Sequence, residues 1–286
     1  FPAAHRTLPM RFSCTIADQG SVENVSRYFK TVAAICRFKV GMKISGEAIE
    51  LHSAESLKAG GHSLTLKFDA SSAFSTYAFL PFSEDIPFIM LEVEINKLVD
   101  IFSQAKGHVR WKLFNKPDQT TGLKKPHFLV QMRESHCNHN IPVTVVTEKR
   151  WEAYERQPQP MGMQIALPPV RTIFRVLQQF RQAQARFVIM QCDQEGRFQM
   201  GARLDQAQAA VHFPDCMVDM SVTSEIHPFK TKLDIKPLLT CFGGLLSAPH
   251  CTCQLNVISE RVAEIQVLLY ESELSFVIGA VNNEAP

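Results

Sequence analysis

Two short clusters of histidine and cysteine contain the atoms that commonly bind zinc. Residues 136–139 read His-Cys-Asn-His and residues 250–253 read His-Cys-Thr-Cys. Together they could supply four ligands, but neither has the C-x₂-C or H-x₃₋₅-H spacing that lets one turn present two ligands to a tetrahedral ion. At strand spacing Cys251 and Cys253 point to the same face, which two core cysteines also do. We therefore expect no metal site, and keep a zinc- or thiol-dependent enzyme as an alternative from another functional class.

Other signatures of catalysis are missing from the sequence. It contains no phosphate-binding loop, dinucleotide fingerprint, nucleophile elbow or zinc-protease motif. The carboxylates are scattered, and no pair of them can be assigned to acid and base. We expect a protein that is not an enzyme, with no catalytic residues and no cofactor.

Length and composition indicate a folded protein of two domains. The 286 residues are 45% hydrophobic and 20% charged, and 30 Lys+Arg against 28 Asp+Glu leave a formal charge of +2. Any basic surface must therefore be local. Apolar runs fall far short of the roughly 18 residues of a membrane span, and the first nine residues lack a signal-peptide core. We expect no membrane segment, and we interpret the eight cysteines as reduced thiols.

A local concentration of positive charge lies between residues 156 and 192. This stretch holds five arginines and no Asp, Glu or Lys. In the helix expected over residues 171–181, Arg171 and Arg175 share a face with two glutamines, opposite the apolar residues. An acid-free cationic stripe suits phosphate contact, but a solvated helix face has the same pattern.

Hydrophobic periodicity predicts the same order of elements twice: a strand, a helix, several strands, a second helix and three strands. The helices are expected at residues 21–36, 96–106, 171–181 and 236–246. Few helices and many strands predict the α+β class, with two helices packed on one face of an antiparallel sheet in each of two similar domains. The polar stretch 148–162, with its two prolines, is interpreted as the interdomain connecting loop. The domains are then residues 10–147 and 163–281, with residues 1–9 as an N-terminal extension.

One phrase of the sequence occurs in both halves. LEVEINKLVDIF at residues 91–102 has its echo in KLDIKPLLTCF at residues 232–242. A shift of 140 residues superposes Glu94 on Asp234, Ile95 on Ile235, Leu98 on Leu238, Val99 on Leu239 and Phe102 on Phe242. Each phrase leads from an expected strand into the second helix of its half, so we predict a duplicated unit.

A duplicated unit with two helices on one sheet face is the plan of sliding clamps. Four phrases resemble, in order, the Hus-type subunit of the nine-one-one DNA-damage checkpoint clamp, a PCNA-like family. They are MRF (10–12), IPVTVVTEKRW (141–151), LDIKPLL (233–239) and YESELSFVIGAV (270–281). The tail departs from the family by reading FVIGAV where a proline usually follows the isoleucine. The resemblance implies the DNA-clamp fold.

The resemblance also implies a function and partners. It predicts a non-catalytic subunit of a heterotrimer with Rad-nine-type and Rad-one-type clamp subunits, which encircles double-stranded DNA in the nucleus without regard to sequence. An ATP-dependent clamp loader would open the ring, and checkpoint and repair proteins would dock on it. A homotrimeric PCNA-like processivity clamp is the alternative within the same fold.

In clamps the helices line a central hole around duplex DNA, so the resemblance implies a set of DNA-facing cations. They are Arg27, Lys30, Lys97, Lys106, Arg171, Arg175 and Arg181. Contacts of this kind reach phosphates and carry no sequence information, so binding is expected to be weak and strongly salt-dependent.

Clamp rings close by strand pairing between two different exposed edges. The resemblance places these edges at residues 141–146 and 208–213, with Ile141, Val143, Val145, Ala209, Val211 and Phe213 as interface residues. Pro142 favours an edge, although composition alone leaves open that both are internal strands.

In clamps the connecting loop covers a groove for short peptide motifs, so Trp151 and Tyr154 are predicted to shape a docking site. The alternative is that these two aromatics tuck onto their own domain.

Overall fold

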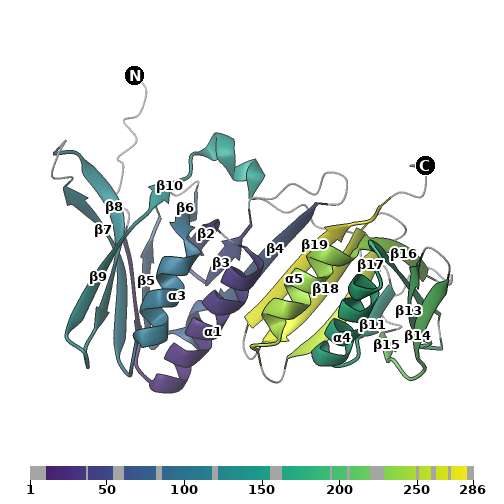
Figure 1. Cartoon of the computed structure of the whole chain (residues 1–286). Helices are drawn as coiled ribbons and strands as arrows, with labels where there is room; N and C mark the ends of the chain where they lie inside the picture. The colour runs from purple at the N-terminus through teal and green to yellow at the C-terminus, as the bar shows by residue number, and fades with distance from the viewer. Residues whose placement is uncertain are drawn as a thin grey trace. The chain divides into compact units, whose positions relative to one another are not determined.

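The chain divides into two compact units (Figure 1). Unit 1 comprises residues 1–53 and 66–155, and unit 2 comprises residues 54–65 and 156–286. The computed structural model describes residues 11–36, 38–53, 61–81, 86–117, 122–154, 163–193, 195–204, 207–219, 229–248, 251–258, 262–269 and 272–281. The predicted extension 1–9 and most of the predicted loop, residues 155–162, lie outside this description, so the domain boundaries stay a prediction.

Unit 1 holds two antiparallel sheets and two long helices among its described residues. Its elements are β1 (Arg11–Ile16), α1 (Gln19–Ile35), β2 (Lys39–Ser45), β3 (Ala48–His52), β4 (His62–Asp69, of which residues 66–69 belong to this unit), α2 (Ala70–Ala73), β5 (Thr76–Leu80), β6 (Phe88–Glu94), α3 (Ile95–Gln104), β7 (Val109–Pro117), β8 (Lys124–Met132), β9 (Cys137–Pro142), β10 (Thr144–Val145) and the 3₁₀ helix η1 (Glu148–Ala153). The strands follow one another as β5-β1-β7-β8-β9 and as β10-β6-β2-β3-β4.

Unit 2 repeats this topology except for β10, which has no counterpart among its described strands. It contains β11 (Met163–Ala166), α4 (Val170–Gln182), β12 (Phe187–Cys192), β13 (Phe198–Arg203), β14 (Gln208–Phe213), β15 (Val218–Asp219), β16 (Phe229–Asp234), α5 (Ile235–Leu245), β17 (Thr252–Ile258), β18 (Val262–Leu269) and β19 (Ser272–Gly279). The order β15-β11-β17-β18-β19 matches β5-β1-β7-β8-β9, and β16-β12-β13-β14 matches β6-β2-β3-β4. The predicted α+β class is confirmed. The sequence did not show that the strands of each unit divide between two sheets.

Helix α1 forms where capping and periodicity agree. The Asp18 carboxylate accepts a hydrogen bond from the backbone N–H of Ser21 at 2.8 Å, which caps α1 and lowers the pKa of Asp18. Every third or fourth residue of α1 is then buried, including Val25, Phe29 and Val32. One side of the helix is therefore left for polar and charged residues.

The echoed phrases occupy equivalent places in the two cores. Strand β6 runs into α3, and β16 runs into α5. Three of the apolar pairs that the phrases share are no more than 1% exposed: Ile95, Leu98 and Phe102 in one unit, Ile235, Leu238 and Phe242 in the other. The fourth pair, Val99 and Leu239, is half-buried. In unit 1 the rings of Phe29 and Phe102 meet edge to face, 5.0 Å apart, where α1 packs on α3. The repetition in sequence is thus a repetition of helix-to-core packing.

Two predicted elements differ from the structure. Residues 141–146, expected as one edge strand, divide: Ile141 and Pro142 end β9, which pairs with β8, whereas β10 pairs with β6 in the other sheet. Pro142 has no N–H to donate, and the N–H of Val143 bonds to the Pro126 carbonyl at 3.1 Å as the chain leaves the first sheet. Helix α3 ends at Gln104, so Lys106 lies beyond it rather than within it.

We predict that truncating Phe102 will destabilise unit 1. Phe102→Ala removes a ring that is 1% exposed and touches Phe29 and Trp111, so the free energy of unfolding should fall by about 3–5 kcal/mol. Urea unfolding followed by tryptophan fluorescence measures it. Phe38→Ala is the matched control, because Phe38 is 80% exposed and its loss should change stability by less than about 0.5 kcal/mol. Equal effects of the two variants would contradict this account of the core.

Candidate functional site

Helix α4 presents a cationic face. Its apolar side, which includes Ile173, Leu177 and Phe180, is buried, whereas Arg171, Arg175 and Arg181 are exposed. Among the described residues these three guanidinium groups take part in no ion pair or hydrogen bond. The positive charge of α4 is therefore not neutralised by any acidic side chain among the residues that the structure describes.

The predicted DNA-facing cations of unit 1 are partly neutralised. The Arg27 guanidinium lies 3.5 Å from the Glu23 carboxylate, and the Lys97 ammonium lies 2.9 Å from the Glu94 carboxylate. Lys30 on α1 and Lys106 after α3 are exposed and unpaired among the described residues. Exposed ion pairs of this kind are worth about 0–1 kcal/mol, so they can open towards a phosphate at small cost.

The strands predicted as subunit edges lie at the ends of their sheets. Strand β9 is the last of the order β5-β1-β7-β8-β9, and β14 is an end strand of β14-β13-β12-β16. An end strand leaves one row of backbone N–H and C=O groups without a partner in its own sheet, which a second strand can pair with. The six predicted residues do not all share these two edges, however.

The side chains of the six residues differ in exposure. In β14, Ala209, Val211 and Phe213 are half-buried. Ile141 of β9 is 1% exposed, so its side chain is not available at the edge, and Val143, which is 6% exposed, lies between β9 and β10 with its N–H bonded to Pro126. Val145 is 41% exposed and belongs to β10, at the end of the other sheet of unit 1.

The first part of the predicted docking loop packs on its own unit. The Trp151 ring lies 4.7 Å from the ring of Phe88, and its indole N–H donates to the Val146 carbonyl at 3.1 Å. The Tyr154 side chain is 6% exposed, and its hydroxyl donates to the Glu92 carboxylate at 2.8 Å. Burial and this bond raise the pKa of Tyr154 to about 12. Both aromatic side chains therefore pack against their own unit, which is the alternative given in the sequence analysis, and Trp151 is half-buried.

Glu92 holds this segment through Arg150 as well, and it also pairs with Lys39 of the neighbouring strand β2. Arg150 of η1 donates to the same carboxylate, and the Lys39 ammonium lies 3.9 Å from it. The rings lie close to the sheet because position 41 is glycine: a Cβ there would be 2.5 Å from Tyr154 Cδ1 and 2.8 Å from Met90 Cε. The sequence analysis missed Gly41 and Glu92, and no motif in the chain points to them.

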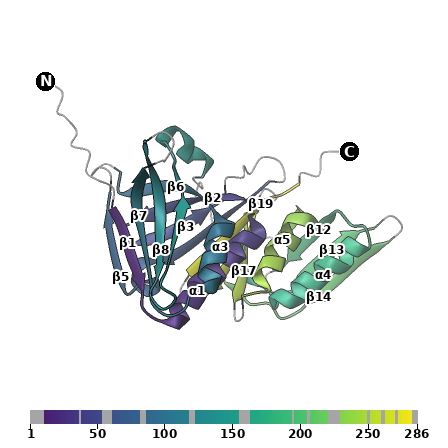
Figure 2. The same cartoon turned by 60° about the vertical axis from the view of Figure 1, so that its left-hand side comes forward.

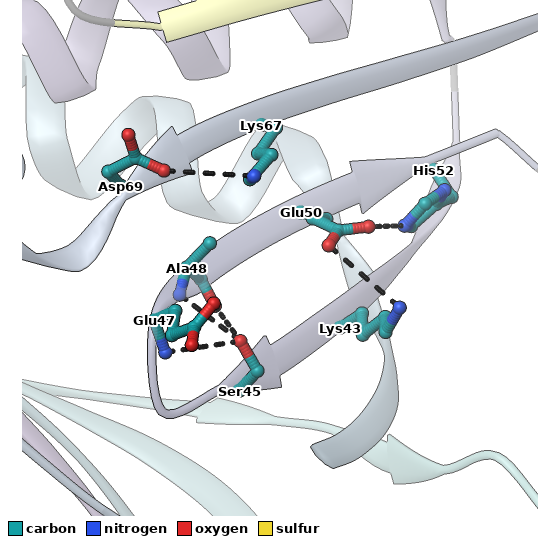
Figure 3. Close-up of polar contacts among 8 residues, drawn as sticks. All are labelled: Lys43, Ser45, Glu47, Ala48, Glu50, His52, Lys67 and Asp69. Carbon is teal, nitrogen blue, oxygen red and sulfur yellow. Dashed lines mark hydrogen bonds and ion pairs between the residues drawn. The ribbon is translucent and has the colours of Figure 1, made fainter. Parts of the chain in front are cut away.

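A second polar cluster, unpredicted from the sequence, lies on strands β2 and β3 (Figure 3). The Glu50 carboxylate accepts from His52 Nε2 at 3.0 Å and lies 3.8 Å from the Lys43 ammonium. The bond with His52 is the largest of the effects that lower the pKa of Glu50. Ser45 bonds the backbone of Ala48 across the turn between the two strands. These contacts stabilise the β2–β3 hairpin, and the alternation of Glu50 and His52 on one strand face could have indicated them.

The histidine and cysteine clusters do not come together as a metal site in the described part of the chain. The thiols of Cys251 and Cys253 share a hydrogen bond, which lowers the pKa of Cys251 to about 7 and raises that of Cys253. Cys137 is exposed, and its thiol donates to the Ser135 carbonyl. His250 lies outside the described residues. Within the described ranges, no group of three or more His, Cys, Asp or Glu residues could hold a metal ion.

Comparison with known proteins identifies the family. A sequence model described as Hus1-like protein matches residues 10–282. The chain belongs to the Hus1-like family. This confirms the resemblance predicted from the four phrases, and it accounts for the duplicated topology.

The structural comparison agrees with the family. A crystal structure of proliferating cellular nuclear antigen from Entamoeba histolytica is similar to this Hus1-like chain, with a TM-score of 0.69 and 9% sequence identity, over 94% of this chain and 98% of that chain. At such low identity the likeness concerns the fold, and the predicted DNA-clamp fold is confirmed. No curated protein sequence matches the chain. Within the described residues, no helix has the length and apolar character needed to cross a bilayer.

We predict that Gly41→Ala will displace Tyr154. The added methyl would overlap the ring, so the free energy of unfolding should fall by about 1–3 kcal/mol. In a Tyr154→Ala background the same substitution should cost less, because the ring is gone and the remaining overlap is with Met90 Cε, the end of a flexible side chain. Urea unfolding of the four proteins measures the coupling. Gly46→Ala is the matched control, since nothing lies within 4 Å of a Cβ there. A Gly41→Ala cost that is independent of Tyr154 would exclude this explanation.

Proposed function

We propose that this Hus1-like chain is a non-catalytic subunit of a heterotrimeric sliding clamp that encircles DNA in the DNA-damage checkpoint. The observation that carries the proposal is the arginine face of α4, which no acidic side chain of the described residues neutralises, in a chain with a clamp fold and Hus1-like family membership. The proposed place of work is the nucleus, where the ring would serve as a platform for checkpoint and repair proteins.

The proposed mechanism is topological rather than chemical. Once an ATP-dependent loader has opened and closed the ring around double-stranded DNA, the clamp stays on because it encloses the duplex. Arg171, Arg175 and Arg181 would contact successive phosphates, with Arg27, Lys30, Lys97 and Lys106 adding weaker contacts from unit 1. Such contacts release counterions and read no base, which permits sliding and makes retention depend on salt.

We propose that ring closure uses the two end strands β9 and β14. They are different surfaces, so the contact between neighbouring subunits is heterologous, as a closed ring requires. The unpaired backbone groups of each strand supply the hydrogen bonds, and Ala209, Val211 and Phe213 supply half-buried apolar surface. Rad-nine-type and Rad-one-type subunits would provide the complementary strands.

We propose that peptide motifs of repair proteins dock beside Trp151. Tyr154 is buried and bonded to Glu92, so its part is to fix the chain after η1 rather than to touch a peptide. Trp151 and Phe88 are only half-buried and form an aromatic pair, which suits an apolar anchor residue.

The subunit composition of the ring is the first prediction of this proposal. Native mass spectrometry of the chain alone should give a monomer, and mixing with Rad-nine-type and Rad-one-type subunits of the same source should give a one-to-one-to-one trimer. A homotrimer of this chain alone would instead assign it to the processivity clamps and remove the checkpoint role.

The second prediction concerns the arginine face. Arg171→Glu with Arg175→Glu should leave ring assembly intact and weaken retention of the loaded ring on circular duplex DNA. If both residues contact phosphates, the slope of log affinity against log salt should become shallower by about 1.8. Retention is measured by gel filtration of clamp–DNA complexes at increasing salt.

Two single variants serve as controls for the arginine face. Lys97→Glu should have a smaller effect, because Lys97 already pairs with Glu94, and Lys124→Glu at the exposed start of β8 should have none. Retention of the double arginine variant equal to that of the unaltered ring at low salt would refute the DNA-facing role of α4.

A further inference from the structure

One sheet of unit 2 has a hollow on its exposed face. The sheet β16-β12-β13-β14 buries Val188, Met190, Met200 and Leu233 on one face, and helices α4 and α5 lie against it (Figure 2). The side chains that alternate with these are accessible and surround a hollow of about 320 Å³. It is lined by Ile189, Gln191, Gln199, Gly201, Ala202, Arg203, Gln208, Ala209, Ala210 and Lys230.

The register of the strands explains why the hollow forms there. Ile189 lies opposite Gly201, and Gly201 lies opposite Ala210, so a row of mostly small side chains crosses three strands. The rows on either side carry long polar side chains: Gln191 opposite Gln199, and Arg203 opposite Gln208. Small residues between two rows of long ones leave a slot that runs across the strands. Three strands span about 10 Å, which three or four extended residues would cross.

The groups that line the slot are free to bind. Within the described ranges, no hydrogen bond or ion pair engages the side chains of the three glutamines, Arg203 or Lys230. Each carboxamide offers both donors and an acceptor, and each cation offers donors only. No Asp or Glu of the described residues lines the slot. The slot therefore combines an apolar floor, amide walls and positive charge.

Further positive charge lies next to the slot on the same face. The Lys232 ammonium lies 4.8 Å from the centre of the Phe187 ring, and the Arg186 guanidinium lies 4.9 Å from it. The acid nearby, Asp234, lies 4.0 Å from Arg186, an ion pair at the limit of contact. Among the described residues, the side chains around the slot thus carry an excess of positive charge, which favours a negatively charged occupant.

We propose that this slot binds an extended acidic peptide segment of a protein partner, with its backbone against the glutamines and its carboxylates against Arg203 and Lys230. Main-chain amides both donate and accept hydrogen bonds, as the carboxamides do, whereas a DNA backbone only accepts. The apolar floor of Ile189, Gly201 and Ala210 can pack against peptide Cα and Cβ atoms, and these three residues offer no side-chain donor for a phosphate. None of the residues that line the slot belongs to the connecting loop or to the arginine face of α4, but Gln208, Ala209 and Ala210 lie on β14, the strand proposed for ring closure. The binding is proposed for the chain by itself, so it does not rest on the proposed clamp function.

A filling substitution tests the slot without changing its charge. A Cβ at Gly201 would lie 3.7 Å from the Ala209 carbonyl oxygen and 3.8 Å from Gln199 Nε2, which are ordinary contacts, so Gly201→Val should fold. Valine also favours strands. The second variant, Arg203→Glu with Lys230→Glu, changes two exposed side chains and keeps the slot open. Lys124→Glu, an exposed reversal on unit 1, is the control.

The probe is a fluorescein-labelled peptide of about eight residues that alternates glutamate and serine, long enough to cross the slot. Fluorescence anisotropy at low salt should show that it binds the unaltered chain and the Lys124→Glu control equally. Gly201→Val and the double reversal should each weaken binding by about tenfold or more. A lysine–serine peptide of the same length should not bind, and excess inorganic phosphate should not displace the acidic peptide.

Several outcomes would overturn the inference. They are equal binding by the unaltered chain and Gly201→Val, binding of the lysine peptide, displacement by phosphate, or displacement by duplex DNA at equal charge. Arg171→Glu with Arg175→Glu separates the two proposals, because that variant should keep peptide binding whatever happens to DNA retention. Circular dichroism of each variant shows whether a loss of binding reflects a loss of fold.

Discussion

The packing of one apolar helix stripe against its core is the constraint on which the rest of each unit depends. The strand-to-helix passages β6–α3 and β16–α5 place Leu98, Phe102 and their counterparts in the interior, where they are no more than 1% exposed. A helix that buries one stripe must present the opposite stripe to solvent. In α4 that stripe is made of arginines and glutamines, so burial of Phe180 and its neighbours fixes where the positive charge lies.

Sheet ends form the second level of organisation. A sheet of finite width has end strands with unpaired backbone groups, and these are the groups that the proposed ring closure would pair between subunits. In unit 1 the chain reaches this end through Pro142, which cannot donate a hydrogen bond, and then crosses to the other sheet as β10. The same residue therefore ends β9 and directs the chain towards η1, the first part of the predicted connecting loop.

The segment after β10 shows how a polar stretch becomes ordered. Its composition is that of a linker, yet Trp151 and Tyr154 find aromatic and carboxylate partners on β6, and glycine at position 41 leaves room for the Tyr154 ring. Burial of the two rings offsets the entropy of ordering the chain. Gly201 in the sheet of unit 2 differs from Gly41, because the space left by its missing side chain forms a hollow that no part of the described chain fills.

The sequence by itself determined the class, the duplication and the family, because hydrophobic periodicity, the 140-residue echo and four phrases are local patterns. It also predicted the cationic face of α4, since a helix fixes which residues share a side. Tertiary structure alone decided the division of strands between sheets, the partners of Glu92, the role of Gly41 and the slot at Gly201. Each of these depends on side chains brought together from different strands, and the register that joins them is set by long-range pairing that no local pattern specifies.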